Sequence, residues 1–174
     1  MAFQRIGFQN RGNGNPDDEG VSADVVRFAF WASTSGATGV GQAGDLRVTA
    51  TATPSGSVYV QRGAAIIESA FTSSQSYAVM NDAAVQVAVP ANNSASAVTW
   101  QVIVRVFDAQ YPGEPDNTGI PSVLLVGALP AGQTYIHLAT ITMPANTAIV
   151  AQSQIADRRD MVNPRRKTDN RMAY

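Results

Sequence analysis

One stretch of the chain, residues 98–108 (VTWQVIVRVFD), is rich in β-branched and aromatic residues and contains neither Gly nor Pro. Because the side chains of a strand point alternately to its two faces, one face of this stretch is wholly apolar and the other is mixed. The apolar face consists of Trp100, Val102, Val104 and Val106. The mixed face consists of Gln101, Ile103, Arg105 and Phe107. The pattern predicts a central strand that lies between two layers of the fold.

Short apolar segments separated by turn-forming residues continue from residue 45 onward. The expected strands are 46–53, 57–61, 64–71, 77–80, 84–89, 98–108, 122–129, 135–143 and 148–155. The turns between them are rich in Pro, Gly, Asn and Ser, which favour reversal of the chain. Residues 45–156 are therefore expected to form an all-β domain, either an antiparallel β-sandwich or a jelly-roll-like barrel.

Residues 1–44 and 157–174 are predicted to lie outside this domain, as an N-terminal arm with a Gly-rich loop and as a C-terminal arm. The N-terminal arm has hydrophobic residues set among polar ones: Phe3, Ile6 and Phe8. We expect them to dock either on the chain's own domain or on a neighbouring subunit. Residues 21–31 are interpreted as a strand, although their first half also fits a helix capped by Ser22.

The C-terminal segment differs in charge from the rest of the chain. Residues 157–174 have six basic and three acidic residues, a net charge of +3, whereas residues 1–156 have six basic and ten acidic residues, a net charge of −4. The basic residues of the segment are Arg158, Arg159, Arg165, Arg166, Lys167 and Arg171. The segment is interpreted as an arm that binds an acidic neighbour, with a solvated terminus as the alternative. The chain's pI of about 5.7 argues against nucleic acid as the partner.

Candidate chemistry is sparse, since the sequence has one histidine and no cysteine. His137 alternates with apolar neighbours, so it is expected to face solvent or another strand rather than to act as a base or a ligand. Glu114 and Asp116 lie on a loop near Asp108 and could bind Ca²⁺ through oxygen atoms, but a wide turn needs the same residue types. We expect no enzyme, no catalytic residue, no cofactor and no metal site.

A glycine pattern, Gly39-x-Gly41-x-x-Gly44, resembles the fingerprint of a dinucleotide-binding turn. That turn must open a helix whose N-terminus meets the pyrophosphate. The residues that follow here, DLRVTATATP, alternate and are β-branched, so they predict a strand. The pattern is therefore interpreted as a flexible loop.

Charged residues make up 14% of the chain, against roughly 25% in an average globular domain. Strand faces rich in Ala and Thr, such as residues 49–53, lack charged partners and need cover. We therefore expect an oligomer, most simply a homotrimer. The N-terminus lacks the apolar stretch of a signal peptide, and no apolar run approaches the roughly 20 residues that span a bilayer, so a protein made in the cytoplasm without membrane contact is expected.

The succession VQRGAAIIES, SYAVMNDAAVQVAVP, VIVRVFDAQYPGE, VLLVGALPAG and LATITMPANTAIVAQSQIADRR resembles a β-sandwich module of tailed-phage virion proteins. The similarity is to minor tail and baseplate proteins of phages of Gram-positive hosts, and it covers residues 57–159. Its most specific parts are Arg105, Asp108, the turn at 111–113 and the closing motif IADRR. In that family the module stands near the start of a longer fibre or receptor-binding protein and forms trimers.

The resemblance implies a non-enzymatic structural subunit of a tailed-phage virion, most simply a minor tail or baseplate protein that binds itself and other virion proteins. More than 40 residues precede the matching part and 15 follow it, with no fibre domain after it, which favours a small structural or capsid-decorating subunit. A glycan- or cell-wall-binding module is the other alternative. In that case exposed aromatic residues would stack on host-surface sugars: Tyr59, Tyr77 and Tyr111.

Arg105 should have a partner if the central strand lies between two layers. An unpaired guanidinium there would cost several kcal/mol. The candidate acceptors are Asp157 and Asp108. Asp157 is preferred because the closing strand is expected to join the same sheet.

Overall fold

The computed structural model of the protein describes residues 4–5, 23–108, 111 and 120–162. The helical elements are α1 (Ala23–Thr34) and the 3-10 turn η1 (Gln152–Gln154). The strands are β1 (Gln4–Arg5), β2 (Gly39–Val40), β3 (Val48–Ala50), β4 (Ser57–Val60), β5 (Gly63–Glu68), β6 (Ser76–Asn81), β7 (Val85–Ala88), β8 (Val98–Phe107), β9 (Ile120–Val126), β10 (Tyr135–Met143) and β11 (Ile155–Asp157). Strands are thus the main regular elements of the described chain, as the alternating pattern predicts.

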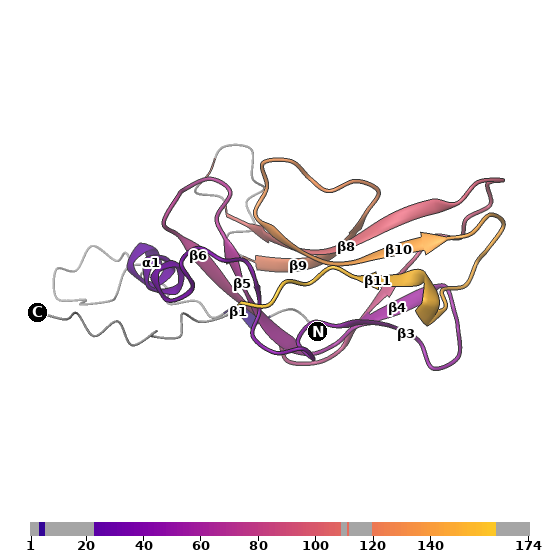
Figure 1. The fold of residues 1–174 in the computed structure, drawn as a ribbon, viewed down its shortest axis with the longest axis horizontal. Helices are drawn as coiled ribbons and strands as arrows, with labels where there is room; N and C mark the ends of the chain where they lie inside the picture. Colours follow the sequence, from indigo (N-terminus) through magenta and orange to yellow (C-terminus); the bar gives the residue numbers. More distant parts are fainter. Residues whose placement is uncertain (1–3, 6–22, 109–110, 112–119, 163–174) are drawn as a thin grey trace, which may run out of the picture.

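The strands form three antiparallel sheets, with the orders β1-β6-β5-β2, β11-β10-β8-β9 and β3-β4-β7. Figure 1 shows β8, β9 and β10 along the upper side of the molecule, β3 and β4 below them, and β5 and β6 toward the end where α1 lies. Side chains from all three sheets meet in one hydrophobic core, including Val58, Ile67 and Val104. The prediction of an all-β, sandwich-like fold is confirmed, and the described strands do not close into a barrel.

The central strand is β8, which pairs with β10 on one side and with β9 on the other. Val102, Val104 and Val106 of its apolar face are buried in the core. On the mixed face Ile103 is fully buried. The other three residues of that face are half-buried: Gln101, Arg105 and Phe107. The apolar face was therefore predicted correctly, and the mixed face has only partial cover.

Residues 21–31 were predicted to be a strand, and this is wrong: α1 spans Ala23–Thr34. The alternation of Val26, Phe28 and Phe30 suggested a strand. Burial follows the helical period instead, because Arg27, Trp31 and Thr34 turn inward while Phe28 is exposed. The proposed cap, Ser22, lies outside the described residues.

Local geometry explains where α1 begins and ends. Asp24 in its first turn complements the helix dipole. Ser35 and Gly36 have left-handed backbone conformations (φ 58° and 77°), and the Gly36 N–H donates to the Trp31 carbonyl at 3.0 Å, which stops the helix.

The end of the described chain packs onto the fold. Residues 148–155 were predicted to be one strand, but Val150 makes only an isolated bridge to Ser55, and the strand that joins the sheet is β11. After β11, the Val40 N–H donates to the Asp160 carbonyl at 2.8 Å and the Val162 N–H donates to the Val40 carbonyl at 2.9 Å. Residues 157–162, predicted to belong to the basic arm, therefore lie against β10 and β2.

Candidate functional site

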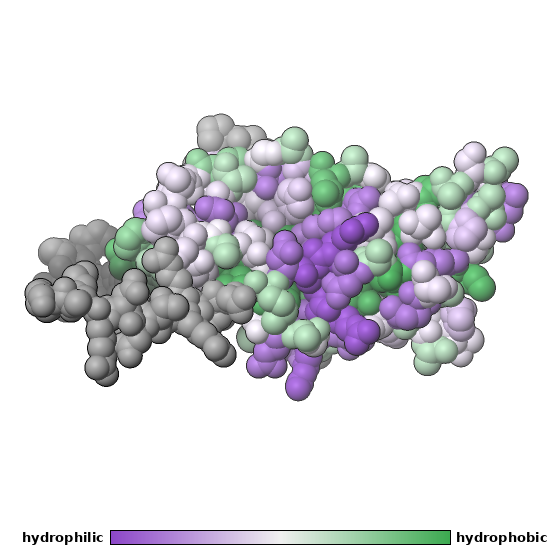
Figure 2. Space-filling model, in the orientation of Figure 1, coloured by the Kyte–Doolittle hydropathy of each residue, from purple (hydrophilic) through white to green (hydrophobic). Residues whose placement is uncertain are grey.

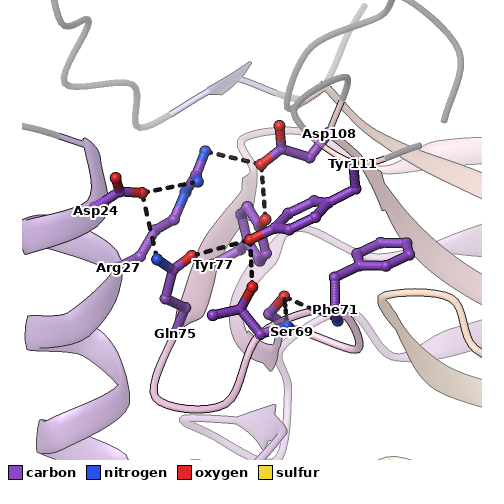
Figure 3. Close-up of polar contacts among 9 residues, drawn as sticks. Asp24, Arg27, Ser69, Phe71, Gln75, Tyr77, Asp108 and Tyr111 are labelled. Carbon is purple, nitrogen blue, oxygen red and sulfur yellow. Dashed lines mark hydrogen bonds and ion pairs between the residues drawn. The ribbon is translucent and has the colours of Figure 1, made fainter.

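A cluster of polar side chains lies where α1 meets β6 and the end of β8 (Figure 3). We call it the helix-anchoring cluster, and its members are Asp24, Arg27, Thr72, Gln75, Tyr77, Asp108 and Tyr111. Three elements supply its centre. Arg27 lies on the inward side of α1, and Tyr77 lies on the core-facing side of β6. Asp108 directly follows β8 and continues the alternation of its apolar face.

Asp108 is the centre of the cluster, with a side chain that is only 5% exposed. Its Oδ2 lies 2.8 Å from Nη2 of Arg27 and accepts a hydrogen bond from the Tyr77 hydroxyl at 2.7 Å. The Arg27 guanidinium also lies over the Tyr77 ring, 4.9 Å from its centroid. A buried carboxylate is stable only with such partners, so the three side chains form one unit.

Burial, and then the hydrogen bond to Asp108, raises the pKa of Tyr77 far above its usual value of 10.0. The hydroxyl therefore stays protonated and donates its proton to the carboxylate. A phenol held in this state is neither a nucleophile nor a base near neutral pH. The centre of the cluster is chemically suited to holding elements together.

The rim of the cluster ties α1 to the turn between β5 and β6. Asp24 accepts hydrogen bonds from Nη1 of Arg27 at 3.4 Å and from Nε2 of Gln75 at 3.3 Å. The hydroxyls of Tyr111 and Thr72 lie 2.7 Å apart. Tyr111 also stacks on Phe71, with ring centroids 4.6 Å apart and planes 16° apart.

Two aromatic residues of the glycan hypothesis take part in this cluster. Tyr77 was expected to be exposed, which is wrong, because it is 8% exposed and bound to Asp108. Tyr111 is half-buried against Phe71, and Tyr59 is half-buried on β4. No residue-level signal in the sequence pointed to Arg27, since it lies in the segment that was interpreted as a strand.

Arg105 has a partner, but not the one that was preferred. Its Nη2 donates to Oε1 of Gln133, and its guanidinium lies 4.4 Å from the centroid of the Phe107 ring. Asp157 cannot reach Arg105, because β10 lies between β11 and β8. Residues directly opposite one another in a sheet also point to the same face, and Asp157 is in register with the other face of β8. Asp157 stands opposite Ala139, which pairs with Val102 of the apolar face.

Asp157 instead binds Arg159 two residues later. The Arg159 Nε donates to Oδ1 of Asp157 at 2.9 Å, and Nη2 lies 2.6 Å from Oδ2, a bidentate pair. These bonds lower the pKa of Asp157 below its usual value of 3.8. Nη1 of Arg159 donates to the Asp45 carbonyl, and the Arg159 side chain is 6% exposed. Arg159, expected to bind a partner, therefore fastens the segment after β11 to its own domain.

Arg158 is the other described member of the predicted basic arm. It is exposed, its N–H donates to the Leu138 carbonyl at 3.0 Å, and its Nε donates to Thr140 Oγ1 at 3.3 Å.

Trp100 is half-buried and packs against the core. The remaining predicted assembly residues lie outside the described part of the chain: Phe3, Ile6, Phe8, Arg165, Arg166, Lys167 and Arg171.

His137 lies half-buried on β10, with Nε2 3.1 Å from the Ala139 carbonyl and 3.4 Å from Thr140 Oγ1. Burial lowers the pKa of His137 below 6.5, so the neutral form predominates at pH 7.

Among the described residues, no three His, Asp or Glu side chains gather as metal ligands, and Glu114 and Asp116 lie outside them. None of the described helices is long and apolar enough to cross a bilayer.

The glycine pattern has a packing role at its first position. A Cβ on Gly39 would stand 2.6 Å from the Asp160 carbonyl oxygen and 2.9 Å from the Val162 nitrogen. Glycine therefore lets residues 160–162 approach β2 closely. Gly44, by contrast, has no atom within 4 Å of such a Cβ.

A groove of about 950 Å³ lies between the 42–49 segment, the connection between β4 and β5, and the end of β6. Its charged lining residues are of both signs: Asp45, Arg47, Arg62 and Asp82. Figure 2 shows strongly hydrophilic residues in the middle of this view, across the path that β11 takes in Figure 1. A mixed lining of this kind favours contact with a polar protein surface over capture of one highly charged ligand.

Comparisons of the chain with family models, with curated proteins and with solved structures found no match.

Proposed function

We propose that the protein is a non-enzymatic structural subunit of a tailed-phage virion, a minor tail or baseplate protein that acts through protein–protein assembly. The resemblance of residues 57–159 to phage virion modules supports this proposal, as does the all-β fold. The central ionisable groups of the helix-anchoring cluster bind one another, which suits a structural role. Large hydrophobic residues remain exposed on the described surface, among them Phe28 (52%), Ile149 (50%) and Met161 (50%).

The observation that carries the proposal is that the basic C-terminal segment begins at a residue that is fixed on the folded body. Val162 is buried and hydrogen-bonded to Val40, so the chain beyond it starts from a set position beside β2. Residues 163–174 have four basic and one acidic residue, a net charge of +3, whereas residues 1–162 have a net charge of −4. The net charge of −4 comes from residues 6–22 and 112–119, since the described residues have seven basic and seven acidic side chains. A basic segment that starts at a defined place on the body is suited to binding acidic residues of a neighbouring subunit.

The experiment is truncation after the anchor. Deleting residues 163–174 keeps the bonds of Asp160 and Val162 to Val40, so the isolated domain should melt close to the full-length protein. Particles assembled with the truncated chain in place of the full chain should lack it. A matched control replaces Arg165 and Arg166 by Lys, which keeps the charge and should keep incorporation. Incorporation of the truncated chain at normal copy number contradicts the binding role of residues 163–174, and absence of the full-length chain from particles contradicts the virion proposal itself.

A homotrimer is part of the proposal, because a module with exposed hydrophobic residues and few charges gains from self-association. Light scattering of the full-length protein at micromolar concentration should give the mass of three chains. Labelling of particles with an antibody separates the tail-tip position from the alternative of a capsid decoration.

A further inference from the structure

The outer edge of β6 binds the N-terminus of the chain. Gln4 and Arg5 of β1 pair antiparallel with Met80 and Val79, so β1 is the outermost strand of its sheet. The contact consists of backbone pairing over two residues. Without β1, β6 would be a sheet edge with unpaired N–H and C=O groups, which is a ready site for an added strand.

β6 is held in place without help from β1. Its other edge is paired with β5 along its whole length. Tyr77 and Val79 of β6 are buried in the core, and the Tyr77 hydroxyl is bonded to Asp108. The acceptor edge therefore exists before any strand docks on it, as strand addition requires.

The connection between β1 and α1 is long. It comprises residues 6–22, which is 17 residues, with the turn-rich sequence GNGNPDDEG inside it. Fully extended, 17 residues span about 56–61 Å. A compact chain of 174 residues has a radius of gyration of about 16 Å, so β1 can reach a subunit at its side. Loops above about 12–15 residues are uncommon inside compact domains, whereas linkers between units are often that long.

We propose that in the assembled protein β1 of one copy adds to β6 of the next copy, so that the N-terminal arm links subunits by strand exchange. The partner is a second copy of this chain, because the two strands already match in register within one chain. Exchange keeps the same backbone contact and changes only which chain supplies it. Subunits held side by side raise the local concentration of arms, which favours exchange over closure on the same chain. The inference rests on the proposed function, since assembly is what holds the copies together.

Cysteine cross-linking of the full chain tests this directly, because the natural sequence has no cysteine. Gln4 and Met80 are directly opposite in the register, within the spacing that a disulfide needs. Two single variants, Gln4→Cys and Met80→Cys, are mixed, one with a size tag, and oxidised gently. A disulfide between them can form only between two chains. Ala64→Cys is the matched control, because Ala64 is exposed on β5 opposite Met80, one strand further from β1.

We expect the mixed dimer of Gln4→Cys with Met80→Cys, in a yield that rises with protein concentration, and little of the dimer with Ala64→Cys. Three results overturn the proposal. The first is that no mixed dimer forms while the double variant Gln4→Cys/Met80→Cys forms its disulfide within single chains. The others are that neither the mixture nor the double variant forms a disulfide, or that Gln4→Cys gives equal yields with Met80→Cys and with Ala64→Cys. The truncation experiment separates this outcome from the proposed function. If exchange is absent but the full-length chain enters particles and the chain lacking 163–174 does not, only the strand exchange is wrong. If exchange occurs but the full-length chain is absent from purified particles, only the proposed function is wrong.

Discussion

The helix-anchoring cluster predicts that Asp108→Asn strongly destabilises the domain, although the substitution only replaces a carboxylate oxygen by an amide nitrogen. The amide keeps the volume of the side chain but removes the charge that faces Arg27, 2.8 Å away. Removing one partner of a buried ion pair costs about 3–5 kcal/mol. The Arg27 side chain is 17% exposed and retains some hydration, so we expect the lower end, about 3 kcal/mol.

Urea unfolding followed by far-ultraviolet circular dichroism measures this loss. A change of about 3 kcal/mol corresponds to a melting temperature lowered by roughly 6–12 °C in a domain of this size. Asp24→Asn is the matched control, because Asp24 faces the same guanidinium at 3.4 Å with a side chain that is 58% exposed. An exposed pair of this kind contributes about 0.5 kcal/mol or less.

The double variant Arg27→Met/Asp108→Asn completes a thermodynamic cycle. It removes both charges, so neither is left buried alone, and it should be more stable than the sum of the two single changes predicts. The reasoning is refuted if Asp108→Asn unfolds within about 0.5 kcal/mol of the natural protein, or if Asp24→Asn costs as much as Asp108→Asn.

Three further changes probe the rest of the fold. Gly39→Ala should lose about 1–3 kcal/mol, because its Cβ would meet the backbone of the 160–162 segment, whereas Gly44→Ala should be close to neutral; thermal melts compare the two. Because Arg159 lowers the pKa of Asp157, that carboxylate stabilises the fold above about pH 4 and loses this effect as pH falls through its folded pKa. The stability gap between the natural protein and Asp157→Asn should therefore narrow from about pH 6 to about pH 2, and a constant gap contradicts the assignment. Burial lowers the pKa of His137, so the unfolded chain binds more protons below about pH 6.5 and stability falls there. His137→Gln should flatten unfolding profiles between about pH 7 and pH 5, and an unchanged slope counts against the burial of this ring.

Features encoded in local alternation could be predicted from the sequence. The apolar face of β8 was predicted from its alternating sequence, and Val102, Val104 and Val106 on that face are buried, whereas Trp100 is half-buried. The antiparallel, sandwich-like arrangement follows from many short strands separated by turns. The helix α1 could not be recognised in this way, because Val26, Phe28 and Phe30 alternate by chance while Arg27 and Trp31 determine which side faces the sheet.

Contacts that join distant residues left no signal in one sequence. Tyr77 and Asp108 belong to different sheets, and Arg27 reaches them only because α1 packs at the end of the sandwich. The partner of Arg105 was missed for a similar reason, since Gln133 lies in the connection between β9 and β10. Physical argument correctly required a partner for the guanidinium, but choosing it required the strand order.

The central claim, that the protein is a structural part of a phage particle, is tested most directly by measuring its copy number in purified virions of the phage that encodes it. Quantitative mass spectrometry against the major capsid protein gives the number, and gold labelling of an epitope tag gives the position. We predict a low copy number that is a multiple of three, with label at the tail end. Absence of the protein from purified, infectious particles contradicts the account.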